Sequence, residues 1–390
     1  MRVCFIVSSY EPGTTGGQAE VVLRLQKNLL ERSVEAYVMT SGMDVQGYPR
    51  TVRTRCGKRL FYALSVAYLN WIRKMDFDVI NVHADSGMSV VPFLAAIKCR
   101  AKIVTTIHNS HLCEQRSIGR LQGFQRRYAH PTFDEYAMKY LLTPVKFFGT
   151  YIDCAFSDRI IAVSAWTRNV CKAEYGIPEE KFSVIHNGVD LTEFNPQIAR
   201  TQIRSMFSLH EDPIILSVGC ASIWKGIPYL LRSMVNVTAR LPDARLIVVG
   251  SRRYQDQMQL LTKELGIQKN VIFPGPVTRE ELPFYYSACD VFAMPTICEG
   301  FPLVVLEAMA SGRPVVASRV GGIPEAIETG SNGILFEPGN VSQLTRALLS
   351  LLEDGSLRRN MGRKARLVAE TKHDWKKITD KYMAEFESLL

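Results

Sequence analysis

The sequence lacks several features that would place it in common protein classes. No stretch approaches the roughly 18 consecutive apolar residues of a membrane-spanning helix. Its nine cysteines contain no Cys-x-x-Cys pair, so we expect reduced thiols in a cytoplasmic protein rather than a disulfide framework. Residues 1–9 are apolar but have no small-residue cleavage site, which favours a buried strand over a signal peptide. Neither half has Gly-x-Gly-x-x-Gly after a first strand, so an NAD-dependent dehydrogenase is not expected.

The charge is unbalanced, with a formal net charge of +9. The basic residues gather in two patches without acids, namely Arg50, Arg53, Arg55, Lys58 and Arg59, and then Arg116, Arg120, Arg126 and Arg127. Such patches can bind anionic lipid headgroups at the inner face of the cell membrane, or a phosphate-bearing acceptor. A solvated face of a basic protein explains them equally well. Nucleic acid is not an expected partner, because no recognised binding motif accompanies the charge.

The length of 390 residues and the apolar fraction of 47% suit two α/β domains. Short apolar runs alternate with helical periods, which predicts parallel, doubly wound sheets. The predicted strands of the first half are Val3–Ser9, Glu35–Ser41, Asp78–His83, Lys102–His108, Arg159–Ser164 and Phe182–His186. Those of the second half are Pro213–Gly219, Arg245–Gly250, Val271–Phe273, Asp290–Pro295, Pro314–Ser318 and Gly333–Glu337. Predicted helices include Ala19–Arg32, Leu60–Met75, Gly226–Arg240, Leu303–Ser311 and Val341–Glu353.

An Asn-Gly turn within His186–Asp190 interrupts this pattern and predicts the linker between the domains. The predicted organisation is therefore residues 1–190, residues 191–370 and a C-terminal helix in 371–390 that returns to the first domain. With two Rossmann-like sheets, the expected site is a cleft at the carboxyl ends of their strands. Residues 109–158 show no clean periodicity, and they are either an acceptor lid or packing filler.

The sharpest motif follows a predicted strand that ends at Pro295. A short loop holds Glu299, and Pro302 is expected at the first position of the next helix, where its missing N–H costs nothing. The amides of Leu303 and Val304 then form an anion site that the helix dipole assists. Glu307 lies about one turn further on, so one carboxylate can accept hydrogen bonds from a sugar and the other from a ribose. Two surface acids beside a helix start are the alternative.

Glu299 and Glu307 form a Glu-x7-Glu pair, followed by Ala-Met-Ala-Ser-Gly-Arg-Pro and by Val320-Gly-Gly-Ile-Pro-Glu325. This sequence resembles glycosyltransferase family 4, the retaining transferases with the GT-B fold. Gly16-Gly17, His108, Asn187-Gly188-Val189-Asp190 and Lys225-Gly226 extend the resemblance nearly end to end. It implies an acceptor-side domain in residues 1–190 and a domain in 191–370 that binds the nucleotide sugar. The expected fold class is thus α/β, with two Rossmann-like domains facing across a cleft.

The resemblance also implies roles for individual residues. His108, with His111 as a neighbour, would contact the transferred sugar, Glu299 would orient it, and Lys225 would neutralise the diphosphate leaving group. The family usually has an Arg five residues before that Lys, but here the position is Cys220. Arg252 or Arg253 could replace the missing cation, and the base would rest near Gly250 and Ser251. The implied donor-binding residues are Gly16, Gly17, Gly250, Val277, Gly300, Phe301, Leu303, Val304 and Glu307.

The expected function is that of a retaining hexosyltransferase in glycan or cell-envelope polysaccharide synthesis. The donor would be UDP- or GDP-hexose, and the acceptor a saccharide or a lipid-linked saccharide. No carboxylate is placed as a nucleophile for a two-step displacement, so a donor phosphate oxygen would take the proton of the attacking hydroxyl. Neither a cofactor nor a metal is expected. Asp76-Phe77-Asp78 matches the Asp-x-Asp of metal-dependent transferases, but a helix-to-strand turn accounts for it.

Three other functions share this architecture. The Glu-x7-Glu helix argues against a sugar-nucleotide epimerase, and no signal for a lysine-bound pyridoxal phosphate supports a phosphorylase. A non-catalytic partner subunit with the GT-B fold is the remaining alternative, and Cys220 is the residue that favours it.

Overall fold

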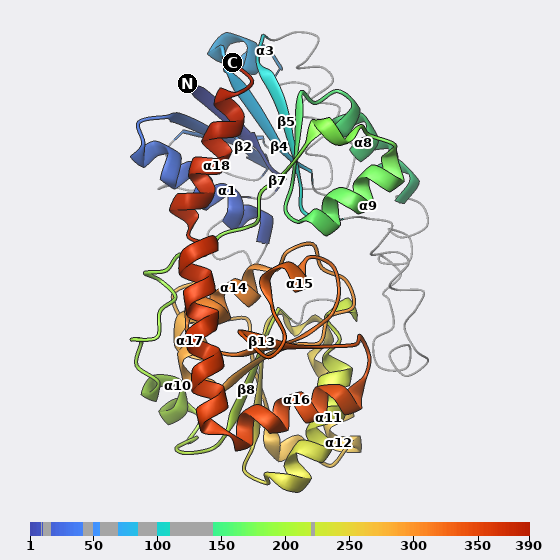
Figure 1. Cartoon of the computed structure of the whole chain (residues 1–390), viewed down its shortest axis with the longest axis vertical. Coiled ribbons are helices and arrows are strands. Elements are labelled where there is room, and N and C mark those ends of the chain that lie inside the picture. Colours follow the sequence, from blue (N-terminus) through green and yellow to red (C-terminus); the bar gives the residue numbers. More distant parts are fainter. Residues whose placement is uncertain are drawn as a thin grey trace. The chain divides into compact units, whose positions relative to one another are not determined.

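The computed structural model describes residues 1–8, 10, 17–41, 50–54, 69–84, 100–109, 143–219 and 223–390 (Figure 1). They form two compact units. The N-terminal unit contains the described residues up to Gly188 together with Trp375–Leu390, and the C-terminal unit contains Val189–Asp374. The chain thus passes into the second unit within the Asn-Gly-Val-Asp motif and leaves it before its last helix.

The described strands of the N-terminal unit form one parallel sheet in the order β3-β2-β1-β4-β5-β6-β7. These strands are β1 (Arg2–Ile6), β2 (Glu35–Ser41), β3 (Thr51–Thr54), β4 (Val79–Ala84), β5 (Lys102–Ile107), β6 (Arg159–Ala162) and β7 (Phe182–Val184). The helices are α1 (Gly17–Glu31), α3 (Leu69–Met75), α8 (Thr143–Ala155), α9 (Ala165–Tyr175) and α18 (Trp375–Glu387).

Both faces of this sheet are packed. On one face, Ile6 of β1 and Ile80 of β4 lie in a cluster with Ile72 of α3. On the other, α18 packs beside α1 (Figure 1), and the hydroxyl of Tyr382 on α18 hydrogen-bonds with Thr106 of β5. The last helix therefore contributes to the core of the N-terminal unit.

The described strands of the C-terminal unit form a parallel sheet in the order β10-β9-β8-β11-β12-β13. They are β8 (Ile214–Val218), β9 (Arg245–Val249), β10 (Val271–Gly275), β11 (Val291–Met294), β12 (Val315–Ser318) and β13 (Gly333–Phe336). The helices are α10 (Thr201–Met206), α11 (Ile227–Arg240), α12 (Gln255–Glu264), α13 (Leu282–Ala288), α14 (Leu303–Ala310), α15 (Ile323–Ala326), α16 (Val341–Glu353) and α17 (Gly355–Lys372).

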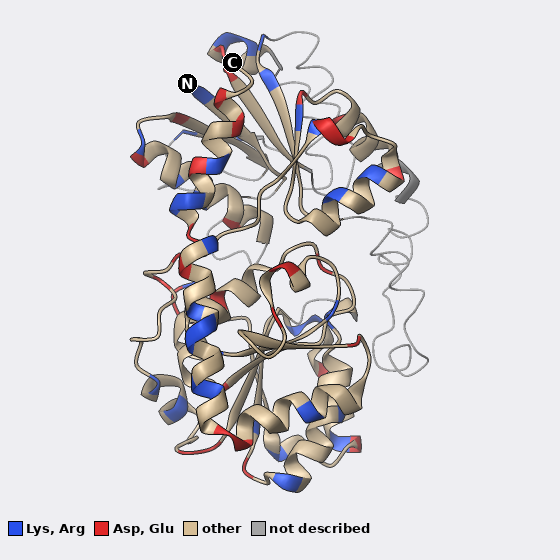
Figure 2. Ribbon diagram, in the orientation of Figure 1, with Lys and Arg blue, Asp and Glu red and all other residues tan. Residues whose placement is uncertain are grey.

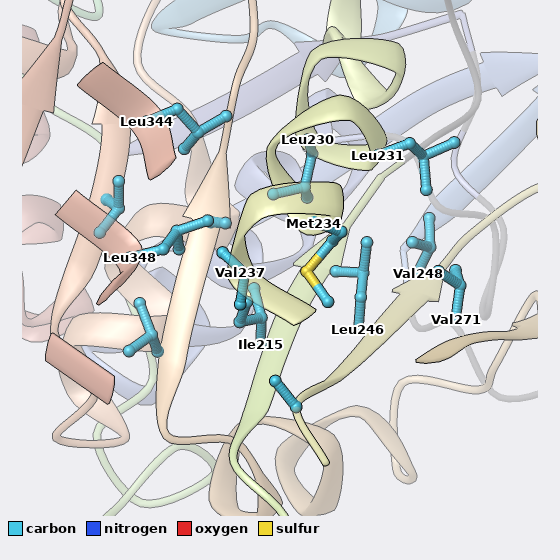
Figure 3. Close-up of a cluster of buried hydrophobic side chains, with 14 of the residues drawn as sticks. Ile215, Leu230, Leu231, Met234, Val237, Leu246, Val248, Val271, Leu344 and Leu348 are labelled. Atoms are coloured by element: carbon cyan, nitrogen blue, oxygen red, sulfur yellow. The ribbon is translucent and has the colours of Figure 1, made fainter. Parts of the chain in front are cut away.

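Apolar side chains of α11 form the centre of the larger core cluster. Figure 3 shows Leu230, Met234 and Val237 of this helix in one cluster with Ile215 of β8 and Leu246 of β9. The strands are apolar on both faces, as buried parallel strands are. Figure 2 accordingly draws them mostly in tan, with most of the charged residues on helices and turns.

Strand order decides where a ligand can bind in such a sheet. In the C-terminal unit the chain winds outward from β8 in one direction and then from β11 in the other. In such sheets a ligand binds in a crevice at the carboxyl ends of the two neighbouring strands at which the strand order reverses. The N-terminal unit has the same arrangement at β1 and β4.

All twelve predicted strands are confirmed to within a few residues, and so are the helices α1, α11, α14 and α16. Of the predicted helix Leu60–Met75, the structure describes Leu69–Met75, and these residues form α3. The segment 109–158, which has no clear period, contains the helix α8, whose Phe147 ring packs 4.9 Å from that of Tyr175. No helix among the described residues is both long and apolar enough to cross a bilayer.

The strand β3 was not predicted, and it changes the interpretation of the first basic patch. Arg53 lies in β3 and is 8% exposed, and its guanidinium donates hydrogen bonds to the carbonyl oxygens of Tyr10 (2.8 Å) and Ser41 (3.4 Å). The interpretation of Arg53 as part of a solvated or lipid-binding face is therefore wrong. The sequence Thr-Val-Arg-Thr has one aliphatic residue, and only the edge position lets it pair as a strand.

Arg53→Met should destabilise the chain by about 1–3 kcal/mol, because it leaves two buried carbonyl groups without their donor. Arg50→Met is the matched control, since Arg50 is exposed and lies 5.3 Å above the ring of Tyr37. It should cost less than about 1 kcal/mol. Thermal unfolding of the two variants measures the difference, and equal midpoints would contradict the structural role of Arg53.

Candidate active site

Two charged side chains meet at the crevice of the C-terminal unit. Lys225 ends a 3-10 turn, Ile223–Lys225, in the loop after β8, and Glu299 lies in the loop after β11. The Lys225 Nζ atom and the Glu299 Oε1 atom form a hydrogen-bonded ion pair, with side chains 24% and 14% exposed. The two residues follow neighbouring strands at the point where the strand order reverses, which is where a ligand site is expected in such a sheet.

The two loops are joined by their backbones as well. The carbonyl oxygen of Trp224 accepts hydrogen bonds from the N–H of Ile297 (2.8 Å) and from the hydroxyl of Thr296 (3.0 Å). Gly226 has φ +71°, and a Cβ atom there would lie 1.8 Å from the carbonyl oxygen of Pro295. Only glycine permits this approach, so Gly226 fixes the distance between the Lys225 loop and the Glu299 loop.

Two further glycines support the Glu299 loop. Gly321 has φ +57°, and a Cβ atom there would lie 1.6 Å from the carbonyl oxygen of Glu299. The N–H of Gly322 donates to the carbonyl oxygen of Gly300 (2.9 Å). The loop that carries Glu299 is thus held between two segments that approach it without side chains.

The helix α14 begins directly after this loop. Pro302 is its N-cap, one position earlier than expected, with φ −76° and ψ 126°, and Leu303 is the first helical residue. Within the described part of the chain, the N–H groups of Leu303 and Val304 donate no hydrogen bond. Both residues are partly exposed. Unpaired amides and the positive end of the helix dipole suit this position to an anion.

Glu307 lies one turn further along α14 and is 3% exposed. One of its carboxylate oxygens accepts a hydrogen bond from Arg279 (2.5 Å), and the other accepts one from the hydroxyl of Tyr286 (2.8 Å). Burial and the adjacent Glu307 raise the pKa of Tyr286 well above its ordinary value, so the phenol stays protonated and donates. A carboxylate can accept about four hydrogen bonds, which leaves Glu307 able to accept from a ligand hydroxyl.

Arg279 connects Glu307 to residues near the start of the C-terminal unit. Its guanidinium also donates to Glu193 (2.6 Å) and lies 4.6 Å above the ring of Phe194. Neither Arg279 nor Tyr286 was identified from the sequence. These two partners of Glu307 lie 28 and 21 positions before it, and no motif spacing links them to it.

The edge formed by β9 and β10 carries the residues expected near a base. The N–H of Gly250 donates to the carbonyl oxygen of Gly275 (3.0 Å), and Gly250 lines a small pocket with Ser251 and Tyr254. Val277 is not among the residues that line it. The Arg252 side chain lies over Gly275, and a Cβ atom there would be 3.0 Å from Arg252 Nε. Arg252 is therefore placed at the carboxyl edge of the sheet.

Two expected donor-binding residues, Gly300 and Phe301, make contacts within the C-terminal unit. Gly300 supplies the carbonyl oxygen that accepts from Gly322, whereas the Phe301 side chain is buried and its ring centre lies 5.5 Å from that of His373.

In the N-terminal unit, Gly17 begins α1 and His108 follows β5. His108 is partly exposed, and its Nε2 atom lies 2.9 Å from Nδ1 of His83. His83, at the end of β4, was not identified from the sequence. Gly16, His111 and Cys220 lie outside the described residues.

Asp76 and Asp78 lie in the turn between α3 and β4. Asp76 has φ +51°, and the carboxylate of Asp78 accepts a hydrogen bond from the N–H of Arg2 (2.6 Å). Among the described residues, no group of three or more His, Cys, Asp or Glu side chains could hold a metal ion. The pair thus has a structural explanation in the turn.

Two family models match consecutive parts of the chain. The model of Glycosyltransferase Family 4 matches residues 15–193, and that of Glycosyl transferases group 1 matches residues 199–368. An uncharacterized glycosyltransferase of Methanocaldococcus jannaschii is 29% identical over 97% of this chain and 96% of its own length.

Two further similarities concern parts of the chain or the fold. A GDP-mannose-dependent alpha-(1-6)-phosphatidylinositol monomannoside mannosyltransferase of Mycolicibacterium smegmatis is 32% identical over 56% of this chain and 59% of its own length. The crystal structure of Anabaena HepE in complex with UDP-glucose superposes on this chain with a TM-score of 0.78 and 21% identity, and the match covers 100% of each chain. The matched models, the relatives and the two parallel sheets agree: the chain belongs to glycosyltransferase family 4 and has the GT-B fold.

Proposed function

We propose that this glycosyltransferase moves a hexosyl unit from a UDP- or GDP-hexose to a saccharide or lipid-linked acceptor, with retention of anomeric configuration and without a metal. The observation that carries the proposal is the Lys225–Glu299 ion pair, whose Glu299 lies in the loop that leads directly to the unpaired amides of α14. A positive group, two N–H donors and a carboxylate suit a ligand that is anionic at one end and rich in hydroxyl groups at the other.

Lys225 and the α14 amides would bind the diphosphate. As the bond between the anomeric carbon and the diphosphate breaks, negative charge grows on the leaving oxygen, and donors already in place stabilise it. The Arg usual in the family is replaced by Cys220, so Lys225 takes a larger share of this charge. Arg252 is in place at the same sheet edge to contribute.

Glu299 would orient the transferred hexose. Its ion pair with Lys225 keeps the carboxylate in place, and its second oxygen can accept hydrogen bonds from sugar hydroxyls. The acceptor oxygen would form its bond to the anomeric carbon on the face that the diphosphate leaves. A donor phosphate oxygen would take the proton of the acceptor hydroxyl, so no protein carboxylate is needed as nucleophile. His108 is assigned to the transferred sugar from the N-terminal unit, as the family resemblance implies.

The relatives support two donors. The M. smegmatis mannosyltransferase is named as GDP-mannose-dependent, and its name gives a phosphatidylinositol mannoside as acceptor. HepE is seen with UDP-glucose. We therefore propose a UDP- or GDP-hexose as donor and include lipid-linked saccharides among the acceptors.

The full chain should turn over one member of a set of UDP-glucose, UDP-galactose and GDP-mannose, and EDTA should leave the rate unchanged, because Lys225 and the amides replace a divalent ion. Release of UDP or GDP measures turnover, with and without simple saccharide and lipid-linked acceptors. An NMR spectrum of the product gives its anomeric configuration. Loss of turnover in EDTA, restored by a divalent metal, would contradict the metal-free part of the proposal, and an inverted product the retaining part. Absence of both donor hydrolysis and transfer would favour the non-catalytic partner.

Lys225→Met should lower kcat/KM for the donor by about 10²- to 10³-fold, because a positioned charge on the leaving group is lost. Lys225→Arg should recover part of the rate. Lys263→Met is the matched control, since it removes the same charge from the exposed end of α12. If Lys225→Met and Lys263→Met had equal kinetics, Lys225 would not act on the leaving group.

A further inference from the structure

The N-terminal unit contains a pair of histidines that the sequence separates by 25 positions. His83 lies on β4 opposite Thr106 of β5, and His108 is two residues beyond Thr106 on the same side of the sheet. The Nδ1 atom of His83 lies 2.9 Å from Nε2 of His108, and the two ring centres are 5.1 Å apart at 31°. The two rings therefore form a side-chain hydrogen bond between neighbouring strands.

His83 is fully buried, and the edge of the Phe5 ring packs against it with the ring centres 5.8 Å apart. Burial lowers the pKa of His83 well below its ordinary value, and a charge on His108 lowers it further. His83 is therefore neutral under ordinary conditions, with one nitrogen that donates and one that accepts.

A neutral His83 constrains the ring beside it. If its Nδ1 atom donates, Nε2 of His108 accepts, and the hydrogen of neutral His108 must be on Nδ1. If Nε2 of a neutral His108 donates instead, Nδ1 of His108 keeps its lone pair. In either arrangement the hydrogen bond orients the His108 ring and leaves its Nδ1 atom with one defined character.

We propose that His83 is a positioning residue for His108. It holds the His108 ring in one orientation and one tautomer, and so determines whether His108 offers a donor or an acceptor to the transferred sugar. The sugar contact rests on the function proposed above, whereas the effect on the His108 ring does not.

Two variants of His83 test this role. His83→Phe fills the buried space but cannot hydrogen-bond, and His83→Asn places an amide near the position of Nδ1. In protein labelled with 15N-histidine, the His108 signals are assigned by their loss in His108→Gln. The wild type should show one protonated and one unprotonated His108 nitrogen. In His83→Phe the two shifts should converge as both tautomers populate, and in His83→Asn they should stay apart.

Kinetics add a second measurement. His83→Phe should lower kcat by about 10- to 100-fold with little change in the donor KM, because the His108 ring is no longer held in register with the reacting sugar. His83→Asn should recover most of the rate. Unchanged His108 shifts together with an unchanged kcat in His83→Phe would overturn the proposal and leave His83 as a packing residue.

Asn81→Val is the matched control for lost stability. Asn81 lies two residues before His83 on the same face of β4, is equally buried and donates to the hydroxyl of Thr106 (3.1 Å). The variant should lower the melting temperature but leave the His108 shifts and kcat unchanged. The shifts also separate this proposal from the proposed function. If the wild type transfers no sugar, the function fails, and the nitrogen shifts still report whether His83 controls His108.

Discussion

The backbone contacts around the Glu299 loop are the constraint on which the rest of the site depends. The carbonyl oxygens of Pro295 and Glu299 lie so close to Gly226 and Gly321 that no Cβ atom could fit at either glycine. Because both glycines also have positive φ, another residue would add backbone strain to the clash. These contacts bring the loops after β8 and β11 together, and the ion pair of Lys225 with Glu299 follows from them.

The groups that would bind a ligand follow one another along α14 and the loop before it. Glu299, which pairs with Lys225, lies in the loop before α14, and the free amides lie at the start of this helix. Glu307 lies one turn later, already bound by Arg279 and Tyr286. A buried carboxylate with two fixed donors has little freedom to rotate, so a ligand hydroxyl meets an oriented acceptor. Arg279 extends this network to Glu193, close to the point at which the chain enters the C-terminal unit.

Periodicity and turn residues sufficed to predict twelve of the thirteen strands that the structure describes, since buried parallel strands are apolar runs. The edge strand β3 was missed because Arg53 looks like a surface charge until the carbonyl groups of Tyr10 and Ser41 are seen around it. Glu299 and the start of α14 were predicted because their motif is local, and Lys225 was predicted because the family resemblance implies its role. Arg279, Tyr286 and His83 could not be, since each acts through a partner that only the fold brings near it.

The most direct test of the account is calorimetric titration of the full chain with UDP and with GDP, repeated on Glu307→Gln. The account predicts that one nucleotide binds with a stoichiometry of one and that Glu307→Gln, which keeps the shape but removes the charge of the carboxylate, binds it several-fold more weakly. Binding of neither nucleotide would contradict it. The crevice at β8 and β11 would then not bind a nucleotide-sugar donor, and the chain would be a non-catalytic member of its family.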